Sequence, residues 1–87
     1  MDATRGQRKD MIRAQKLGMR LSALRQKSGL SQEQVAQAAG IATYSYRKLE
    51  HGESNPGRPG NPRLSTLAAL SEVFGIKTSD LVDGIDE

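Results

Sequence analysis

Apolar residues recur along much of the chain at three- and four-residue steps, the spacing that places side chains on one face of an α-helix. The longest such row predicts a helix over residues 8–27 that turns this face toward a protein core. The row consists of Ala14, Leu17, Leu21 and Leu24. Residues 1–7 hold few apolar side chains, and we expect them to form a flexible, frayed tail before a single domain at 8–87.

A thinner apolar row lies on nearly the opposite face of the same helix. It consists of Ile12, Met19 and Ala23. Single apolar side chains are common on protein surfaces, so this row predicts ordinary exposed positions. A contact with a partner helix, such as that of a second copy of the chain, is the alternative interpretation.

Residues 31–52 predict two short helices joined by a tight turn. Ser31 and Gln34 have the spacing of a capping box, in which each side chain bonds the backbone N–H of the other residue. Gly40 ends the first helix, because glycine readily adopts the positive φ found just after a helix C-terminus. The expected core positions of this segment are Val35, Ala36, Ala39, Ile41, Tyr46 and Leu49.

Small residues beside the turn bear on how the two helices cross. Ala36 lies four residues before Gly40, where a small side chain lets two steeply crossing helices approach closely. This pattern is typical of the helix-turn-helix, whose second helix enters the major groove of DNA. An ordinary αα-hairpin fits the Ala-x-x-x-Gly spacing equally well. The capping box, the corner residue Ile41 and the core pair that follows favour the helix-turn-helix.

Residues 53–62 contain all three prolines of the chain and predict a long loop. Asn61 and Pro62 at its end have the character of an N-cap and a first helical residue. A fourth helix then ends at residue 75, and a short fifth helix is expected from residue 78 or 79 to residue 84. The expected core face of the fourth helix is Leu64, Leu67, Ala68, Leu70 and Phe74. Five helices without a strand candidate predict a compact all-α bundle.

Composition limits the class of protein. The chain has 87 residues and no cysteine, which excludes disulfides and thiolate metal sites and suits one small domain in a reducing compartment. It has neither a signal peptide pattern nor an apolar run of membrane-spanning length. We therefore expect a cytoplasmic protein that makes no contact with a membrane.

The charged residues are distributed unevenly along the chain, whose net charge is +3. Residues 1–28 carry eight Lys or Arg against two Asp, a net of +6, whereas residues 72–87 carry five acidic residues against Lys77, a net of −4. Such a distribution suits a molecule that turns a basic end toward nucleic acid and keeps an acidic end away from it. Ordinary solvated helix surfaces fit the same charges.

Several short motifs stand at fixed spacings between residues 17 and 84. They are Leu21-x-x-Leu24-Arg25, Gly29-Leu30-Ser31-Gln32-Glu33-Gln34-Val35-Ala36, Ala39-Gly40-Ile41, Leu49-Glu50-x-Gly52, and Leu67-x-x-Leu70 followed by Phe74-Gly75-Ile76. Together they resemble the lambda-repressor-like, or XRE (Cro/C1-type), family of helix-turn-helix transcriptional regulators. The resemblance implies a five-helix DNA-binding bundle.

The resemblance also implies roles for particular residues. Thr43, Tyr44 and Lys48 match positions from which a recognition helix reaches base edges, and Arg25 and Glu50 match an ion pair that ties the first helix to the third. The full set of DNA-contacting residues that it implies is Gln32, Thr43, Tyr44, Ser45, Arg47, Lys48, His51, Arg58 and Arg63.

Three features depart from the family pattern. Ala42 stands where Ser or Thr commonly caps the third helix, which makes Thr43 the alternative cap. Tyr46 replaces a usual Ile or Val, and its hydroxyl needs a partner if it is buried. The loop holds about six extra residues at 57–62, which bear on whether Arg58 still reaches a phosphate.

These observations predict sequence-specific binding of double-stranded DNA by a small repressor or autoregulated controller. One such module buries too little surface for tight specific binding, so we expect a homodimer on a palindromic operator. The expected dimer surface is the fifth helix with the end of the fourth, comprising Ile76, Leu81, Val82 and Ile85. Ile12 and Met19 of the first helix form the second candidate.

A protein-interaction module on the same fold, such as an antitoxin or bridging factor, is the alternative, since the third helix offers two Tyr. An enzyme is not expected, because His51 is the only His and no metal-ligand spacing or Gly-rich phosphate motif occurs. We expect no cofactor, no metal and no small-molecule ligand.

Overall fold

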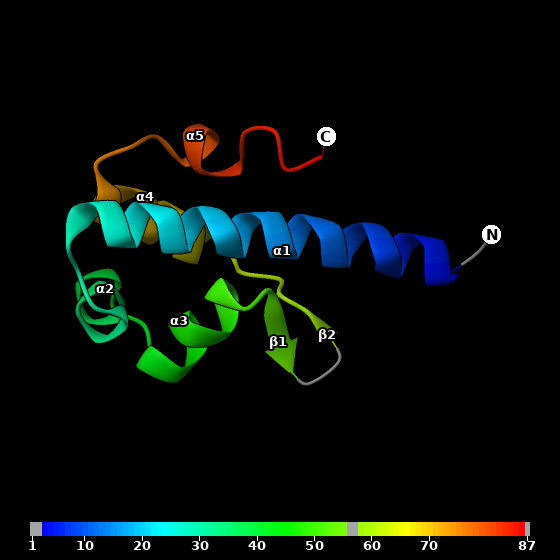
Figure 1. Ribbon diagram of the computed structural model, residues 1–87, viewed down its shortest axis with the longest axis horizontal. Helices are drawn as coiled ribbons and strands as arrows, with labels where there is room; N and C mark the ends of the chain where they lie inside the picture. The colour runs from blue at the N-terminus through cyan, green and yellow to red at the C-terminus, as the bar shows by residue number, and fades with distance from the viewer. Residues whose placement is uncertain (1–2, 56–57, 87) are drawn as a thin grey trace.

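The computed structural model describes the chain at residues 3–55 and 58–86, with side chains at 8–53 and 59–86. A long helix, α1 (Ala3–Ser28), runs the length of the molecule (Figure 1). It begins at Ala3, whereas the sequence pattern predicts a start near Arg8. The helices α2 (Gln32–Ala39) and α3 (Thr43–Glu50) lie on one side of α1, and α5 (Thr78–Val82) lies on the other.

Every helix contributes to one core. Its buried apolar residues are Leu17 and Leu21 of α1, Val35 and Ala36 of α2, Tyr46 of α3, Leu70 of α4 (Leu64–Phe74) and Leu81 of α5. The predicted core row of α1 is confirmed, since Ala14 is also buried and Leu24 packs against the core. The all-α fold class is therefore confirmed.

The segment between α3 and α4 is more ordered than the predicted loop. It holds a short antiparallel hairpin of β1 (Glu53–Asn55) and β2 (Arg58–Pro59), closed by a 2.9 Å hydrogen bond from the Gly60 N–H to the Gly52 carbonyl. Strands of three and two residues are too short to show an alternating pattern in a sequence. The hairpin is a small addition to the helical bundle (Figure 1).

The beginning of α4 differs from the prediction. Arg63, not Asn61, is the N-cap, because residues 61–63 form the extended connection from the hairpin to the helix. Leu64 opens the helix at the edge of the bundle and is 75% exposed, and Ala68 is also exposed, so neither belongs to the core face. The inward face is formed by Leu67, Leu70, Ser71 and Phe74.

The C-terminal segment packs against α1. Arg20 of α1 donates hydrogen bonds to the backbone carbonyls of Leu81, at 3.1 Å, and Asp83, and Arg13 forms an ion pair with Asp86. The acidic end of the sequence therefore lies against the basic first helix. These contacts use two of the cations that the charge distribution assigns to nucleic acid.

The predicted dimer surface on the fifth helix is wrong for Leu81. Leu81 is fully buried in the core of its own chain, and Ile76 packs against that core. Ile76, Val82 and Ile85 are partly exposed. Ile12 and Met19 of α1 are 47% and 72% exposed, as expected for the thinner apolar row.

Two glycines let the backbone of α1 and the backbone at the end of α3 come into direct contact. A Cβ at Gly18 would lie 2.5 Å from the Glu50 carbonyl oxygen and 2.6 Å from that of Leu49. Gly52 has φ +75°, and a Cβ there would lie 3.1 Å from Cα of Gln15. The position of α3 is therefore set by backbone packing against α1 as well as by the core.

Candidate nucleic-acid interface

The turn between α2 and α3 has the predicted geometry. The Ser31 hydroxyl accepts from the Gln34 N–H at 3.0 Å, and the Gln34 side chain accepts from the Ser31 N–H at 2.8 Å. Gly40 has φ +72°, the left-handed conformation that ends α2, and the Ile41 N–H bonds the Ala36 carbonyl at 3.0 Å. The capping box and the glycine stop are thus confirmed, and they fix where α3 begins.

The N-terminus of α3 has no side-chain cap. Ala42 is the N-cap residue and Thr43 is the first helical residue, so Thr43 does not replace the missing cap. Thr43 is partly buried, whereas Tyr44, Ser45 and Arg47 are exposed. These positions make the outward face of α3 polar and accessible.

Tyr44 and Lys48 act as a pair on this face. The Lys48 Nζ lies 4.5 Å from the centre of the Tyr44 ring, which is a cation–π contact between residues one helical turn apart. Tyr44 is 64% exposed, so the pair presents a flat ring together with a held ammonium group.

Arg25 and Glu50 form the ion pair that the family resemblance implies. The Arg25 Nε donates to Glu50 Oε2 at 2.6 Å and Nη2 donates to Oε1 at 3.2 Å, while Nη1 bonds the Leu30 carbonyl at 3.1 Å. Burial opposes the charged form of Glu50, but hydrogen bonds from Arg25 and Gln32, together with the nearby Tyr46 hydroxyl, hold its pKa below the ordinary value. The pair ties α1 to the C-terminal end of α3.

Tyr46 is fully buried beneath this pair. Its hydroxyl lies beside Glu50 and Arg25 but, among the described residues, has no partner within full hydrogen-bond geometry. Burial and the neighbouring carboxylate raise the pKa of Tyr46, so the phenol stays protonated. Tyr46 is therefore a core residue and not part of the outward face of α3.

Gln32 extends the ion pair to the outer surface. Its Nε2 donates to Glu50 Oε1 at 3.0 Å, and its Oε1 accepts from Arg47 Nε at 3.2 Å. Sequence reasoning places Gln32 and Arg47 at the interface but misses their contact. The two residues are 15 positions apart, and only the crossing of α2 and α3 brings them together.

The remaining implied contact residues lie around α3. His51 is the exposed C-cap residue of α3, and Arg63 is the exposed N-cap residue of α4. A groove of about 450 Å³ separates α3 from the start of α4, and Ser45, Lys48, Arg63 and Thr66 are among the residues that line it. The structure thus brings Lys48 and Arg63 to one groove. Arg58 belongs to β2, but its side chain is outside the described part of the structure.

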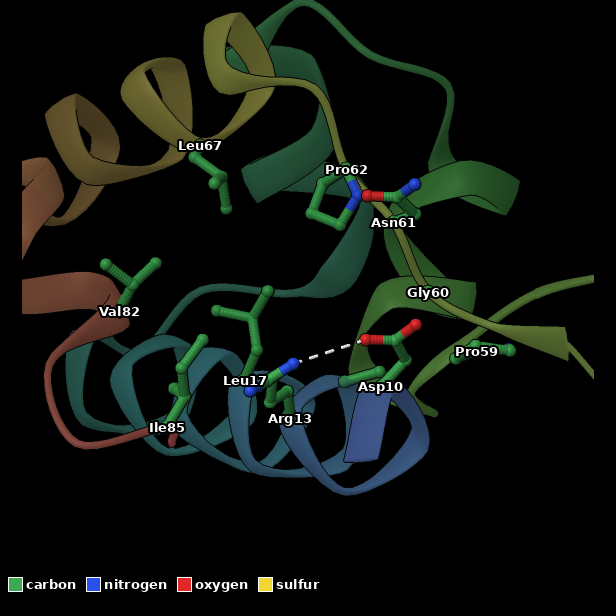
Figure 2. Close-up of a pocket in the computed structure, with 11 residues that line it drawn as sticks. Asp10, Arg13, Leu17, Pro59, Gly60, Asn61, Pro62, Leu67, Val82 and Ile85 are labelled. Carbon is green, nitrogen blue, oxygen red and sulfur yellow. Dashed lines mark hydrogen bonds and ion pairs between the residues drawn. The ribbon is translucent and has the colours of Figure 1, made fainter. Parts of the chain in front are cut away.

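A second groove, of about 540 Å³, lies between α1, residues 59–62, α4 and α5 (Figure 2). Its walls are mainly apolar, with Leu17, Leu67, Val82 and Ile85 among the lining residues, and Asp10 and Arg13 line it from α1. Arg13 there bonds Asp10 at 3.4 Å. This groove includes no residue of α2 or α3.

The described residues contain neither a metal-binding cluster of His, Cys, Asp or Glu nor a helix long and apolar enough to cross a membrane.

Comparison with known proteins adds independent information. The sequence model of the helix-turn-helix domain family matches residues 16–83. The chain is 38% identical over 71 residues to the HTH-type transcriptional regulator DdrOP3 of Deinococcus deserti, covering 82% of this chain and 50% of that protein. It is 36% identical over 67 residues to the SPbeta prophage-derived uncharacterized HTH-type transcriptional regulator YonR of Bacillus subtilis, covering 77% of this chain and 56% of that protein. The matched region thus spans about half the length of these relatives.

Proposed function

Because the chain belongs to the helix-turn-helix domain family, we propose that it is a sequence-specific DNA-binding transcriptional regulator whose α3 enters the major groove. The observation that carries this proposal is the exposed polar face of α3. Tyr44, Ser45 and Arg47 are exposed and Lys48 is partly exposed on this helix. The helix follows the turn at Gly40, and its end is held by Glu50. The named relatives are transcriptional regulators, which supports the same function.

In the proposed complex, cations near α3 supply most of the affinity. Arg63 lines the groove beside α3, and Arg58 lies on the hairpin that follows α3, so we assign both to phosphate neutralisation or groove-edge contacts. Each neutralised phosphate releases counterions and makes binding weaker at higher salt. We also assign His51 to this outer set, because it is exposed at the end of α3.

Fewer side chains read the sequence. Lys48 can donate to guanine O6 and N7, and the Tyr44 ring that holds it can pack on a thymine methyl or a sugar. Thr43 and Ser45 stand beside them in the first turn of α3 and can bond base edges. The proposal thus separates phosphate contacts from a small base-reading group.

We further propose a repressor or autoregulated controller that acts as a homodimer on a palindromic operator in the cytoplasm. Half-sites would be spaced by about 10 base pairs, one helical turn. Since Leu81 is buried in the core, the candidate interfaces are the exposed row with Ile12 and Met19 and the partly exposed residues Ile76, Val82 and Ile85. Charge substitution at Met19 or at Val82, followed by sedimentation, distinguishes the two interfaces.

A protein-interaction module on this fold is the competing function. The exposed Tyr44 favours it, because aromatic residues are enriched at protein interfaces. The second Tyr of α3 does not support it, since Tyr46 is buried. We propose no enzymatic activity: His51 is exposed at a helix end, and the Glu50 carboxylate is already bonded by Arg25 and Gln32.

Selection of duplexes from a randomised DNA pool, followed by titration of the selected duplex, tests the proposal. Neutralisation of about four phosphates predicts an affinity loss on the order of a hundredfold between about 50 and about 200 mM salt. Failure to enrich any sequence, or binding that is insensitive to salt, contradicts DNA regulation and favours a protein partner.

A further inference from the structure

The side-chain amide of Gln32 is held in one orientation by its two neighbours. The Glu50 carboxylate only accepts hydrogen bonds, so the amide nitrogen must face it, and the Arg47 guanidinium only donates, so the amide oxygen must face that side. Exchanging the two ends of the amide would break both bonds. The orientation of Gln32 therefore follows from the chemistry of its partners.

This arrangement links four side chains from three helices. Arg25 of α1 bonds Glu50 of α3, Glu50 bonds Gln32 of α2, and Gln32 bonds Arg47 of α3. Oε1 of Glu50 receives hydrogen bonds from both Arg25 and Gln32, so the ion pair and the amide share one oxygen atom. This series of hydrogen bonds begins at the shielded Arg25–Glu50 ion pair and ends at the exposed guanidinium of Arg47.

Arg47 is held through Nε, on the side of its guanidinium that faces α2. Its side chain is exposed, and its Nη1 and Nη2 groups make no bond to Gln32. Two N–H groups from the terminal edge of a guanidinium match the oxygens of a phosphate. The bond to Gln32 also limits the number of conformations that Arg47 must give up on binding.

The location of Arg47 favours a phosphate over a base. In helix-turn-helix complexes the first helix of the motif crosses the DNA backbone while the second lies in the groove. Arg47 is bonded to the first residue of α2, so it lies on the border of α3 that faces the backbone-crossing helix. Tyr44 and Lys48 pair with each other on α3 and are the base-side group in the proposed complex.

We propose that Arg47 is a phosphate-binding residue and that Gln32 is a positioning residue, which holds Arg47 and is itself oriented by the Arg25–Glu50 pair. This inference rests on the proposed DNA-binding function. It changes the role of Gln32, for which the family resemblance implies direct contact with DNA. The ion pair then contributes to DNA affinity through an unbroken series of hydrogen bonds.

A double-mutant cycle tests the inference. Gln32→Met keeps the length of the side chain and removes both hydrogen bonds, and Gln37→Met is the matched control, an exposed Gln of the same helix. The probes are the duplex selected from a random pool and an unrelated mixed-sequence duplex. Affinity is measured for the parent, both Gln variants, Arg47→Ala and the Gln32→Met/Arg47→Ala double variant.

The expected results are specific. Arg47→Ala weakens binding to both duplexes by a similar factor, about tenfold, and makes the slope of log affinity against log salt shallower by about 1. Gln32→Met weakens binding when Arg47 is present and has no further effect in the Arg47→Ala background. Gln37→Met leaves affinity unchanged.

Two outcomes overturn the inference while the proposed function stands. An equal loss from Gln32→Met in both backgrounds means that Gln32 contacts DNA by itself, and a loss from Arg47→Ala on the selected duplex alone means that Arg47 reads a base. A parent protein that binds neither duplex contradicts the proposed function instead. The intramolecular bond is tested without DNA, because Arg47→Ala must shift the side-chain amide NMR signals of Gln32.

Discussion

Glu50 accepts two hydrogen bonds from Arg25, at 2.6 and 3.2 Å, across the contact between α1 and the end of α3. Both side chains are largely shielded, with 18% of the Arg25 side chain and 7% of the Glu50 side chain exposed. A shielded charge that loses its partner keeps its desolvation cost without its attraction. Removal of either partner is therefore expected to destabilise the fold, and the intact pair holds the end of α3 against α1.

Glu50→Gln is expected to lower the free energy of unfolding by roughly 3 kcal/mol, because it leaves Arg25 without a counter-charge in a shielded site. The matched control is Asp86→Asn, which removes the exposed ion pair with Arg13 and should change stability by less than about 1 kcal/mol. Urea unfolding followed by circular dichroism measures both. Similar small changes for the two variants would show that the shielded pair is not important for stability.

The same carboxylate predicts a dependence of stability on acid. The folded pKa of Glu50 lies below the ordinary value of 4.5, so the ionised form is favoured by folding. The stability that the ionised Glu50 carboxylate contributes to the fold is complete at pH values above that ordinary value. It is lost as the pH falls toward the lowered pKa of the folded protein. Thermal unfolding across acidic pH should show a smaller decline in Glu50→Gln than in the parent. Parallel declines would contradict a lowered pKa at this position.

Gly18→Ala tests the backbone contact between α1 and α3. Alanine favours a helix by about 1 kcal/mol over glycine. However, its Cβ would lie 2.5 Å from a backbone carbonyl oxygen that no side-chain rotation can move, and overpacking of this kind costs about 1–3 kcal/mol or more. We expect net destabilisation and weaker DNA binding, because α3 must shift.

The control for this substitution is Gln15→Ala, at an exposed position of α1. It should leave stability nearly unchanged. A Gly18→Ala variant that is more stable than the parent would mean that α1 and α3 separate at little cost.

Tyr44 and Lys48 give a prediction about recognition without a change in folding. Tyr44→Phe keeps the ring beneath Lys48 and should retain most of the DNA affinity, whereas Tyr44→Ala and Lys48→Ala should each reduce specific binding. Because Tyr44 is largely exposed, stability should change by no more than about 0.5 kcal/mol. Fluorescence anisotropy with the selected duplex measures affinity. Equal affinity of all three variants and the parent would remove this pair from the interface.

Much of the fold could be predicted from the sequence because its signals are local. The capping box at Ser31, the glycine stop at Gly40 and the apolar row of α1 each depend on residues within a few positions of one another. The errors occur where partners are distant. The inward packing of Leu81 depends on how α5 returns to α1, and the exposure of Leu64 depends on where the hairpin ends.

The sequence predicts which residues belong to the candidate interface, but it does not predict which of them bond to one another. The family motifs identify Gln32, Arg47, Arg25 and Glu50, yet their linkage requires the crossing of three helices. Gly18 has no local signal, since a glycine within a helix pattern does not indicate what approaches it. Contacts between residues far apart in the sequence therefore decide how the predicted surface is organised.

Chemical-shift mapping of the ¹⁵N-labelled protein with the selected duplex tests the central claim most directly. If the outward face of α3 enters the major groove, the largest shifts on titration will fall on the backbone amides of Thr43, Tyr44, Ser45, Arg47 and Lys48, with smaller shifts near Gln32 and Arg63. Shifts concentrated on α5 or on the groove between α1 and α4, with α3 unchanged, would contradict that claim.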